Sequence, residues 1–280
     1  MAGEVRIGTS GWVYPHWRET FYPKSTPQSG WLAYYAQRFD TVELNNPFYR
    51  QPERATFERW RRAVPDHIVY AVKLNRFLTH LKRLNVDRAM VARSYDTMAG
   101  LGPKAGVVLL QLPARFRFDT ERVMRFFAAV APRRKRHALE PRDPTWLTDE
   151  ALAVLRERHV ALCIIDAPKW PTRGAVTADF VYLRFHGQTR LYGSSYDVDA
   201  LRRGPSGSAR GATAGSTCTR ISTMTSAHTR RAMPCVCASL SAEQGGTRRA
   251  SLRSWTGRSS RPTASRTSRA RSASAVWPVR

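Results

Sequence analysis

Short apolar runs alternate with longer amphipathic segments through most of this chain. The runs are rich in Val, Ile and Leu and span residues 4–10, 40–45, 68–75, 106–113, 136–142, 160–167 and 180–187. The intervening segments carry apolar residues at three- and four-residue spacing, which predicts helices at 29–39, 54–64, 87–101, 119–130 and 148–159. Regular alternation of strand and helix predicts a parallel sheet, because parallel neighbours need a long crossover connection.

The number of strands narrows the fold class further. A TIM-type (β/α)8 barrel needs eight strands in about 250 residues, whereas seven are visible here, so we predict an incomplete barrel that lacks its last βα unit. A doubly wound open sheet is the rival fold, but no glycine-rich phosphate turn follows the first run. Four of the predicted helices follow an N-capping residue, namely Ser29, Asp87, Asp119 and Thr148.

The composition changes abruptly after Arg203. Residues 204–280 contain 13 Arg, no Lys and one acidic residue, and they have no Phe or Tyr, two Leu and one Ile. That segment has too little apolar surface to offset the entropy lost on ordering its backbone. We therefore predict a barrel domain at 1–203 and a disordered tail at 204–280.

The remaining composition bears on location and partners. No apolar run approaches the roughly 20 residues of a membrane span, and the N-terminus lacks the apolar core of a signal peptide. These features predict a cytoplasmic protein with no membrane partner. Cys163 is the only cysteine before the tail, and its apolar surroundings predict a buried, reduced thiol. The net charge of +25 permits nucleic-acid binding, although the tail supplies almost half of it.

Polar residues stand at the end of each predicted strand, where they would be costly in a core but are normal at the mouth of a barrel. Alternate residues of a strand point the same way, so four successive pairs converge on one site. The resulting candidates are Ser10, Trp12, Glu43, Asn45, Lys73, Asn75, Gln111, Glu140, Arg142, Asp166, Arg184 and His186.

Their chemistry suggests distinct roles. Glu43, Glu140, Asp166 and His186 are the predicted catalytic residues, as general acids and bases or as ligands of a divalent cation such as Mg²⁺. The basic members Lys73, Arg142 and Arg184 would balance the carboxylates and attract an anionic group. Trp12, Asn45, Asn75, His80 and Gln111 complete the predicted substrate site. The alternative is a set of ion pairs that only plugs the barrel top.

Six motifs resemble, in order and spacing, the YecE-like family, the domain of unknown function numbered 72 (DUF72). They are "GTSGWVYPHWRETFYP", "FDTVELNNPFYRQP", "YAVKLNRFLTHLKRL", "LLQLPARFRF", "LEPRDPTW" and "VYLRFHG", and they cover about residues 4–203. The resemblance implies a TIM-type barrel with a polar site at the strand ends, and it implies no reaction. Pro141 departs from the family pattern, which has an aromatic or apolar residue between the positions of Glu140 and Arg142.

The family's final motif, a strand ending in Tyr-Phe-Asn-Asn-Asp, is missing. Residues 220–225 can be encoded by codons that spell this motif when the last base of each is joined to the first two of the next. The same regrouping from Gly204 yields an amphipathic helix and a glycine turn before it. We therefore interpret residues 204–280 as a frameshifted translation, with one base lost next to Arg203, rather than as a native basic tail.

Three functions remain open from the sequence. The first is an enzyme of hydrolase or lyase type that acts on an anionic small molecule by acid–base chemistry, with no nucleotide-cofactor motif and with a metal left open. The second is a barrel that binds or processes nucleic acid, using basic residues for phosphates and aromatic residues for stacking. The third is a ligand-binding barrel without turnover.

Overall fold

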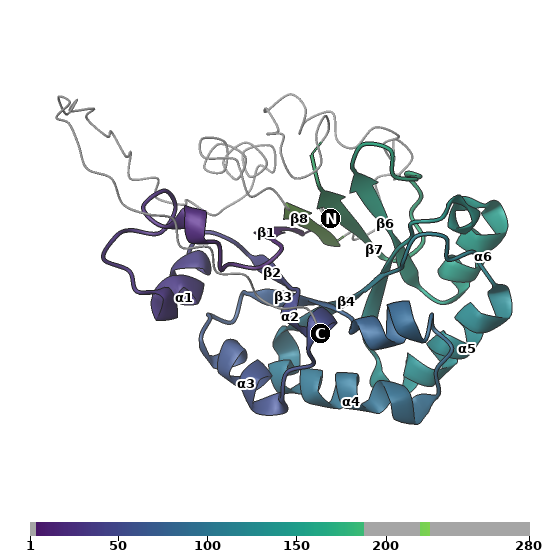
Figure 1. Ribbon diagram of the computed structural model, residues 1–280, viewed down its shortest axis with the longest axis horizontal. Coiled ribbons are helices and arrows are strands. Elements are labelled where there is room, and N and C mark those ends of the chain that lie inside the picture. The colour runs from purple at the N-terminus through teal and green to yellow at the C-terminus, as the bar shows by residue number, and fades with distance from the viewer. Residues whose placement is uncertain (1–3, 188–218, 225–280) are drawn as a thin grey trace, which may run out of the picture. The chain divides into compact units, whose positions relative to one another are not determined.

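The computed structural model describes residues 4–187 and the backbone of residues 219–224. Parallel strands form a closed barrel in chain order (Figure 1). They are β1 (Val5–Thr9), β2 (Thr41–Leu44), β3 (Val69–Lys73), β4 (Ala105–Gln111), β5 (Arg136–Glu140), β6 (Val160–Asp166), β7 (Phe180–Phe185) and β8 (Thr219–Met224). The predicted TIM-type barrel is thus confirmed.

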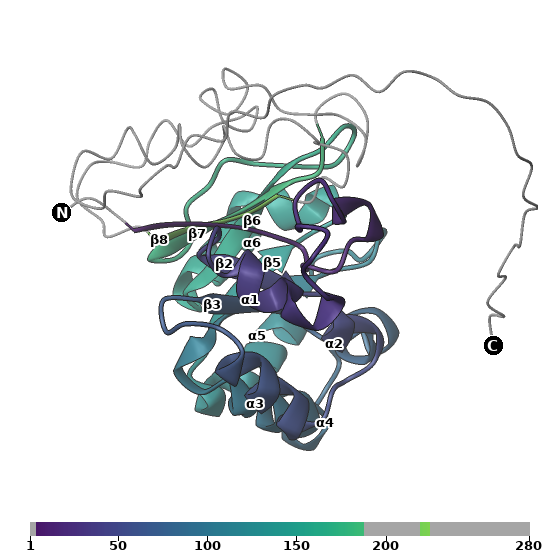
Figure 2. The ribbon, with the colours of Figure 1, turned by 90° about the vertical axis from the view of Figure 1, so that its left-hand side faces the viewer.

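Helices connect most of the strands. Figure 1 shows α3 to α6 in succession along the outside of the strands, and Figure 2 shows α3 and α4 on the side of the barrel away from β7 and β8. The helices are α1 (Trp31–Tyr35), α2 (Asn46–Tyr49), α3 (Arg54–Arg62), α4 (Arg88–Met98), α5 (Thr120–Val130) and α6 (Asp149–Glu157). The connection from β6 to β7 is a loop, in which Thr177 accepts a hydrogen bond from the Leu162 backbone at 2.7 Å and so lies along β6.

Three of the four predicted helix caps are present. Asp87 and Asp119 each accept a backbone N–H three residues on at 2.8 Å, and Thr148 accepts that of Ala151 at 3.3 Å. The prediction for Ser29 was wrong. Residues 28–30 form a 3-10 turn that leads into α1, so Gly30 occupies the N-cap position without a side-chain hydrogen bond.

The eighth strand is the main addition to the sequence prediction. The backbone of β8 pairs in parallel with both β7 and β1, over Thr219–Met224. This stretch overlaps the positions at which the shifted reading frame restores the missing motif. Apart from β8, the predicted disordered tail lies outside the described residues, and the frameshift stays a prediction.

Small and apolar side chains fill the barrel below its mouth. One buried cluster includes Ala71, Leu109, Ala138, Cys163 and Tyr182, which come from five successive strands. Cys163 is a free, buried thiol as predicted. A larger cluster joins the strands to the helices around them. The interior is therefore a packed core rather than a pore.

Gly8 provides a test of the strand register. It pairs with Thr41, and a Cβ atom at Gly8 would lie 1.8 Å from the Thr41 carbonyl oxygen. Such a contact forces β1 away from β2, so Gly8→Ala is expected to lower the free energy of unfolding by about 1–3 kcal/mol. At Gly30 the nearest atom would be 3.4 Å away, so Gly30→Ala is the matched control. Equal urea midpoints for the two variants would contradict the register.

No helix in the described part of the chain is long and apolar enough to cross a membrane. The cytoplasmic location stays a prediction.

Candidate functional site

Strand periodicity explains why polar groups gather at the barrel mouth. On β3, β4, β5 and β7 the last inward-facing residue is polar, and the residue two positions earlier belongs to the buried interior cluster. Because side chains alternate along a strand, the polar group lies directly above the packed interior on each strand. These pairs are Ala71 and Lys73, Leu109 and Gln111, Ala138 and Glu140, and Tyr182 and Arg184.

Arg184 joins the two predicted catalytic glutamates. Its Nη2 donates to Glu43 Oε1 at 2.8 Å, and its Nη1 donates to Glu140 Oε2. The Arg184 side chain is 3% exposed and both glutamates are 0% exposed. A buried charge needs a partner of opposite sign, and this arginine supplies one to two carboxylates at once.

Each oxygen of the two glutamates accepts a hydrogen bond. Glu43 also accepts from Ser10 at 2.9 Å and from the Tyr182 hydroxyl at 2.8 Å. Glu140 also accepts from Gln111 at 2.7 Å and from Arg142. Burial opposes ionisation of Glu140, but the charges of Arg184 and Arg142 outweigh it and lower its pKa to about 2. Glu140 therefore stays ionised at neutral pH and is poorly suited to donate a proton.

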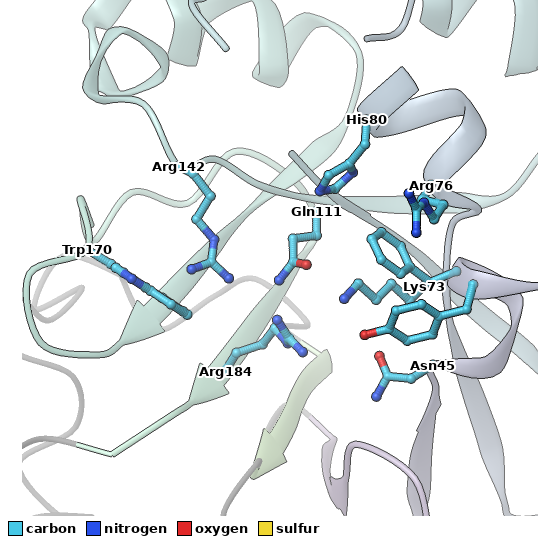
Figure 3. Close-up of a pocket in the computed structure, with 10 residues that line it drawn as sticks. Asn45, Lys73, Arg76, His80, Gln111, Arg142, Trp170 and Arg184 are labelled. Atoms are coloured by element: carbon cyan, nitrogen blue, oxygen red, sulfur yellow. The ribbon is translucent and has the colours of Figure 1, made fainter. Parts of the chain in front are cut away.

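A cavity of about 580 Å³ is lined by three residues that hydrogen-bond to these glutamates, Gln111, Arg142 and Arg184 (Figure 3). In the figure, Lys73, Gln111, Arg142 and Arg184 direct their polar ends toward a shared space. Among the described residues, no carboxylate lines this cavity, whereas four of the lining residues are lysine or arginine. The lining consists of Asn45, Phe48, Tyr49, Lys73, Arg76, His80, Gln111, Arg142, Trp170 and Arg184.

Lys73 differs from the other cations of this cavity. It is 7% exposed, and its Nζ lies 4.0 Å from the centre of the Phe48 ring. Within the described part of the chain, no hydrogen bond or ion pair to Lys73 is found. Burial, followed by the charge of Arg184, lowers the pKa of Lys73 to about 8. Lys73 can therefore exchange a proton near neutral pH.

Not every nitrogen of Arg142 and Arg184 has a hydrogen-bond partner among the described residues. The Nε atoms of Arg142 and Arg184 are buried and have no hydrogen-bond partner among the residues described. Arg142 also lies 3.2 Å above the centre of the Trp170 ring, which fixes the plane of its guanidinium. Both arginines line the cavity, and guanidinium groups are suited to bind a carboxylate or phosphate ligand.

Asp166 and His186 lie beside this cavity rather than on its wall. They are 5% and 1% exposed, and the His186 backbone N–H donates to the Asp166 carbonyl at 2.9 Å. Burial and the charge of Arg184 lower the pKa of His186 to about 3, which keeps the ring neutral. The edge of Trp170 packs on this ring at a centroid distance of 5.0 Å. Catalytic roles for the two residues stay predictions.

A second cavity, of about 390 Å³, adjoins the first and shares Asn45 with it. Its lining includes Ser10, Trp12, Tyr14, Glu43 and Trp60. The rings of Trp12 and Trp60 meet edge to face, with centroids 5.8 Å apart. The cavity lined by Trp12, Tyr14 and Trp60 thus adjoins the cavity lined by lysine and arginine side chains.

Some predicted substrate residues line the site and one does not. His80 faces the cationic cavity, and its Nδ1 lies 2.9 Å from the Thr79 hydroxyl. Asn75 instead holds the backbone, because its side chain bonds the Pro47 carbonyl at 2.7 Å and the Phe77 N–H at 2.9 Å.

The predicted site residues did not include Phe48, Tyr49, Arg76 or Trp170 of the cavity lining, or Tyr182, which bonds Glu43. A signal existed for Tyr182, which shares the two-residue period of Arg184 and His186. Trp170 belongs to a loop without periodicity, so only the structure could place it.

The described residues contain no group of three His, Cys, Asp or Glu side chains that could hold a metal ion. Two of the three carboxylates predicted as possible metal ligands, Glu43 and Glu140, form ion pairs with Arg184 instead. The arrangement at the mouth therefore fits an anion better than a cation.

Comparisons with known proteins agree with the barrel. A family model described as "Protein of unknown function DUF72" matches residues 6–242. The UPF0759 protein YecE of Escherichia coli K12 is 24% identical over 208 residues, covering 65% of this chain and 74% of the relative.

Two solved structures show a similar fold. A DUF72 family protein of Thermotoga maritima has a TM-score of 0.63 at 21% identity, covering 86% of this chain and 98% of that one. One from Enterococcus faecalis has a TM-score of 0.64 at 16% identity, covering 88% and 99%.

Proposed function

This chain belongs to the DUF72 family, and we propose that it is an enzyme that binds a small carboxylate- or phosphate-bearing molecule at the barrel mouth and acts on it by proton transfer. The supporting observation is that Lys73, Arg76, Arg142 and Arg184 line one cavity, while both glutamates lie beneath it, saturated by hydrogen bonds. The positive charges of Arg184 and Arg142 balance the negative charges of the two glutamates. The charges of Lys73 and Arg76 are therefore left in excess and can attract an anionic ligand.

The reaction is of lyase or hydrolase type, and Lys73 moves the proton. A group is an efficient acid or base when its pKa lies near the working pH. The pKa of Lys73, about 8, meets this condition better than that of Glu140, about 2, or that of His186, about 3. In this proposal the glutamates position Arg184 rather than exchange protons with the substrate.

Sulfate binding tests the anion site, because sulfate keeps its charge across the pH range. In calorimetric titrations, sulfate affinity is expected to fall as the pH rises through 8, since Lys73 loses its charge. Lys73→Met is expected to bind about tenfold more weakly at pH 6.5, the loss of one charge-assisted contact, and to lose this pH dependence.

Lys82→Met is the matched control. Lys82 is exposed and lies near the Phe77 ring rather than in the cavity lining. Equal sulfate affinity in the wild type and Lys73→Met, at every pH, would overturn the proposed anion site.

A nucleic-acid partner is the second candidate. Exposed basic residues continue the positive surface beyond the cavity, and the Arg83 side chain donates to the Arg115 carbonyl at 2.9 Å, which joins the loops after β3 and β4. Phosphate contacts by such a rim would make binding of a single-stranded oligonucleotide fall steeply with salt. Binding that is unchanged by Arg115→Glu or by salt would exclude it. The basic residues of this rim are Arg76, Arg83, Arg115 and Arg117.

A further inference from the structure

We propose that Lys73 is a covalent catalyst, whose amine adds to the carbonyl carbon of a substrate bearing a carboxylate or phosphate and forms an imine. This inference rests on the proposed function, because the same cationic cavity must first hold the anionic group. It gives Lys73 a bond-forming role in addition to the anion attraction and proton transfer of the proposed function.

The argument begins from a comparison of two equally buried lysines. Lys104 and Lys73 are each 7% exposed. The Lys104 amine donates to the carbonyls of Arg61 at 2.9 Å and Val64 at 2.6 Å, and it pairs with Asp66 at 3.2 Å. These contacts explain why a lysine is buried there. Among the described residues, Lys73 has no such acceptor. Its Nζ lies 4.0 Å from the centre of the Phe48 ring, and Figure 3 shows its amine directed into the cavity.

Residues that line the cavity can also orient the substrate. Arg142 and Arg184 line it together with Lys73, and guanidinium groups bind carboxylates and phosphates with defined geometry. A carboxylate or phosphate held by these guanidinium groups places an adjacent carbonyl carbon within the space that the Lys73 amine faces. Neighbouring cations of this kind also favour the neutral amine, which is the nucleophilic form.

The charges that face Lys73 act in both directions. Arg184 and Arg142 lower its pKa, Glu43 and Glu140 raise it, and burial is the largest influence. At pH 7 about one Lys73 amine in ten is neutral, against fewer than one in a thousand for an ordinary lysine. The reactive fraction is thus raised by roughly two orders of magnitude.

The proposed step balances without an oxidant or metal. The nitrogen lone pair forms the C–N bond, and the carbonyl π electrons move to oxygen, which takes up a proton. The nitrogen then releases one proton, and its lone pair forms the second C–N bond as the C–O bond breaks. The hydroxyl takes up a proton and leaves as water, which gives the protonated imine. His80 lines the cavity and is suited to carry these protons, since burial and the charge of Lys73 lower its pKa and favour the neutral ring.

Borohydride trapping tests the inference. The full chain is incubated with pyruvate, glyoxylate or dihydroxyacetone phosphate, reduced with sodium borohydride, digested and mapped by mass spectrometry. At least one of these probes is expected to give a reduced adduct on Lys73, at least about tenfold above that on exposed Lys82, following the ratio of neutral amine. Lys73→Arg keeps the charge and is expected to abolish the adduct, whereas Lys82→Arg retains it.

The outcomes separate the two proposals. Sulfate binding in the cavity without an adduct from any probe overturns the covalent role and leaves the anion site in place. Absence of both overturns both proposals. Adducts spread evenly over exposed lysines, or retained in Lys73→Arg, also contradict a specific imine at Lys73.

Discussion

Replacing Arg184 with methionine is expected to lower the free energy of unfolding by about 3–5 kcal/mol. The variant leaves Glu43 and Glu140 buried without their shared cation, and both are 0% exposed. Removing one partner of a buried ion pair costs far more than the pair contributes, because the remaining charge cannot be solvated. Urea denaturation monitored by tryptophan fluorescence measures the change.

Two further variants serve as controls for the effect of Arg184→Met. Arg136 pairs with Asp179 at 2.9 Å on the surface, where the two side chains are 49% and 63% exposed, so Arg136→Met is expected to change little. Adding Glu43→Gln and Glu140→Gln to Arg184→Met removes the unpaired charges and is expected to recover part of the loss. A loss in Arg184→Met no larger than in Arg136→Met would contradict the buried network.

Restoring the reading frame after Arg203 is expected to turn a chain that unfolds broadly or aggregates into one with a sharp thermal transition. The sequence as written places Thr-Arg-Ile-Ser-Thr-Met at β8, where the restored frame supplies the family's Tyr-Phe-Asn-Asn-Asp. We expect the out-of-frame residues to hold β8 in place less firmly, and loss of β8 would leave β1 and β7 as open edges, which invite aggregation. Scanning calorimetry of the two chains side by side measures the difference.

Resequencing the gene is the independent control for the frame. A single intact frame with unrelated synonymous codons would contradict the frameshift, and a sharp cooperative transition in the 280-residue chain itself would contradict the expected instability. The binding and trapping experiments are performed on both chains, so that a folding defect in one does not obscure the chemistry of the site.

Strand periodicity was sufficient to predict the barrel and much of its mouth. Glu43, Lys73, Glu140 and Arg184 were predicted to converge because each stands near the end of an apolar strand, and they do converge. Pro141 does not disturb this arrangement, since β5 ends at Glu140, one residue before it.

The roles of the individual site residues could not be predicted from their spacing in the sequence. Whether a carboxylate faces a ligand or an arginine depends on side chains from strands far apart in the sequence, as Tyr182 and Arg184 show at Glu43. Trp170 contacts Arg142 from an irregular loop. Such a loop has no sequence periodicity from which the direction of a side chain could be predicted. Asn75 has the spacing of a site residue, but its amide satisfies local backbone groups.

A crystal structure of the protein soaked with tungstate, an anion visible by its anomalous scattering, tests the central claim most directly. We predict an anomalous peak in the cavity between Lys73, Arg142 and Arg184, with Glu43 and Glu140 still bonded to Arg184 beneath it. A cavity without tungstate while other surface sites are occupied, or a glutamate side chain turned into the cavity, would contradict an anion-binding barrel mouth.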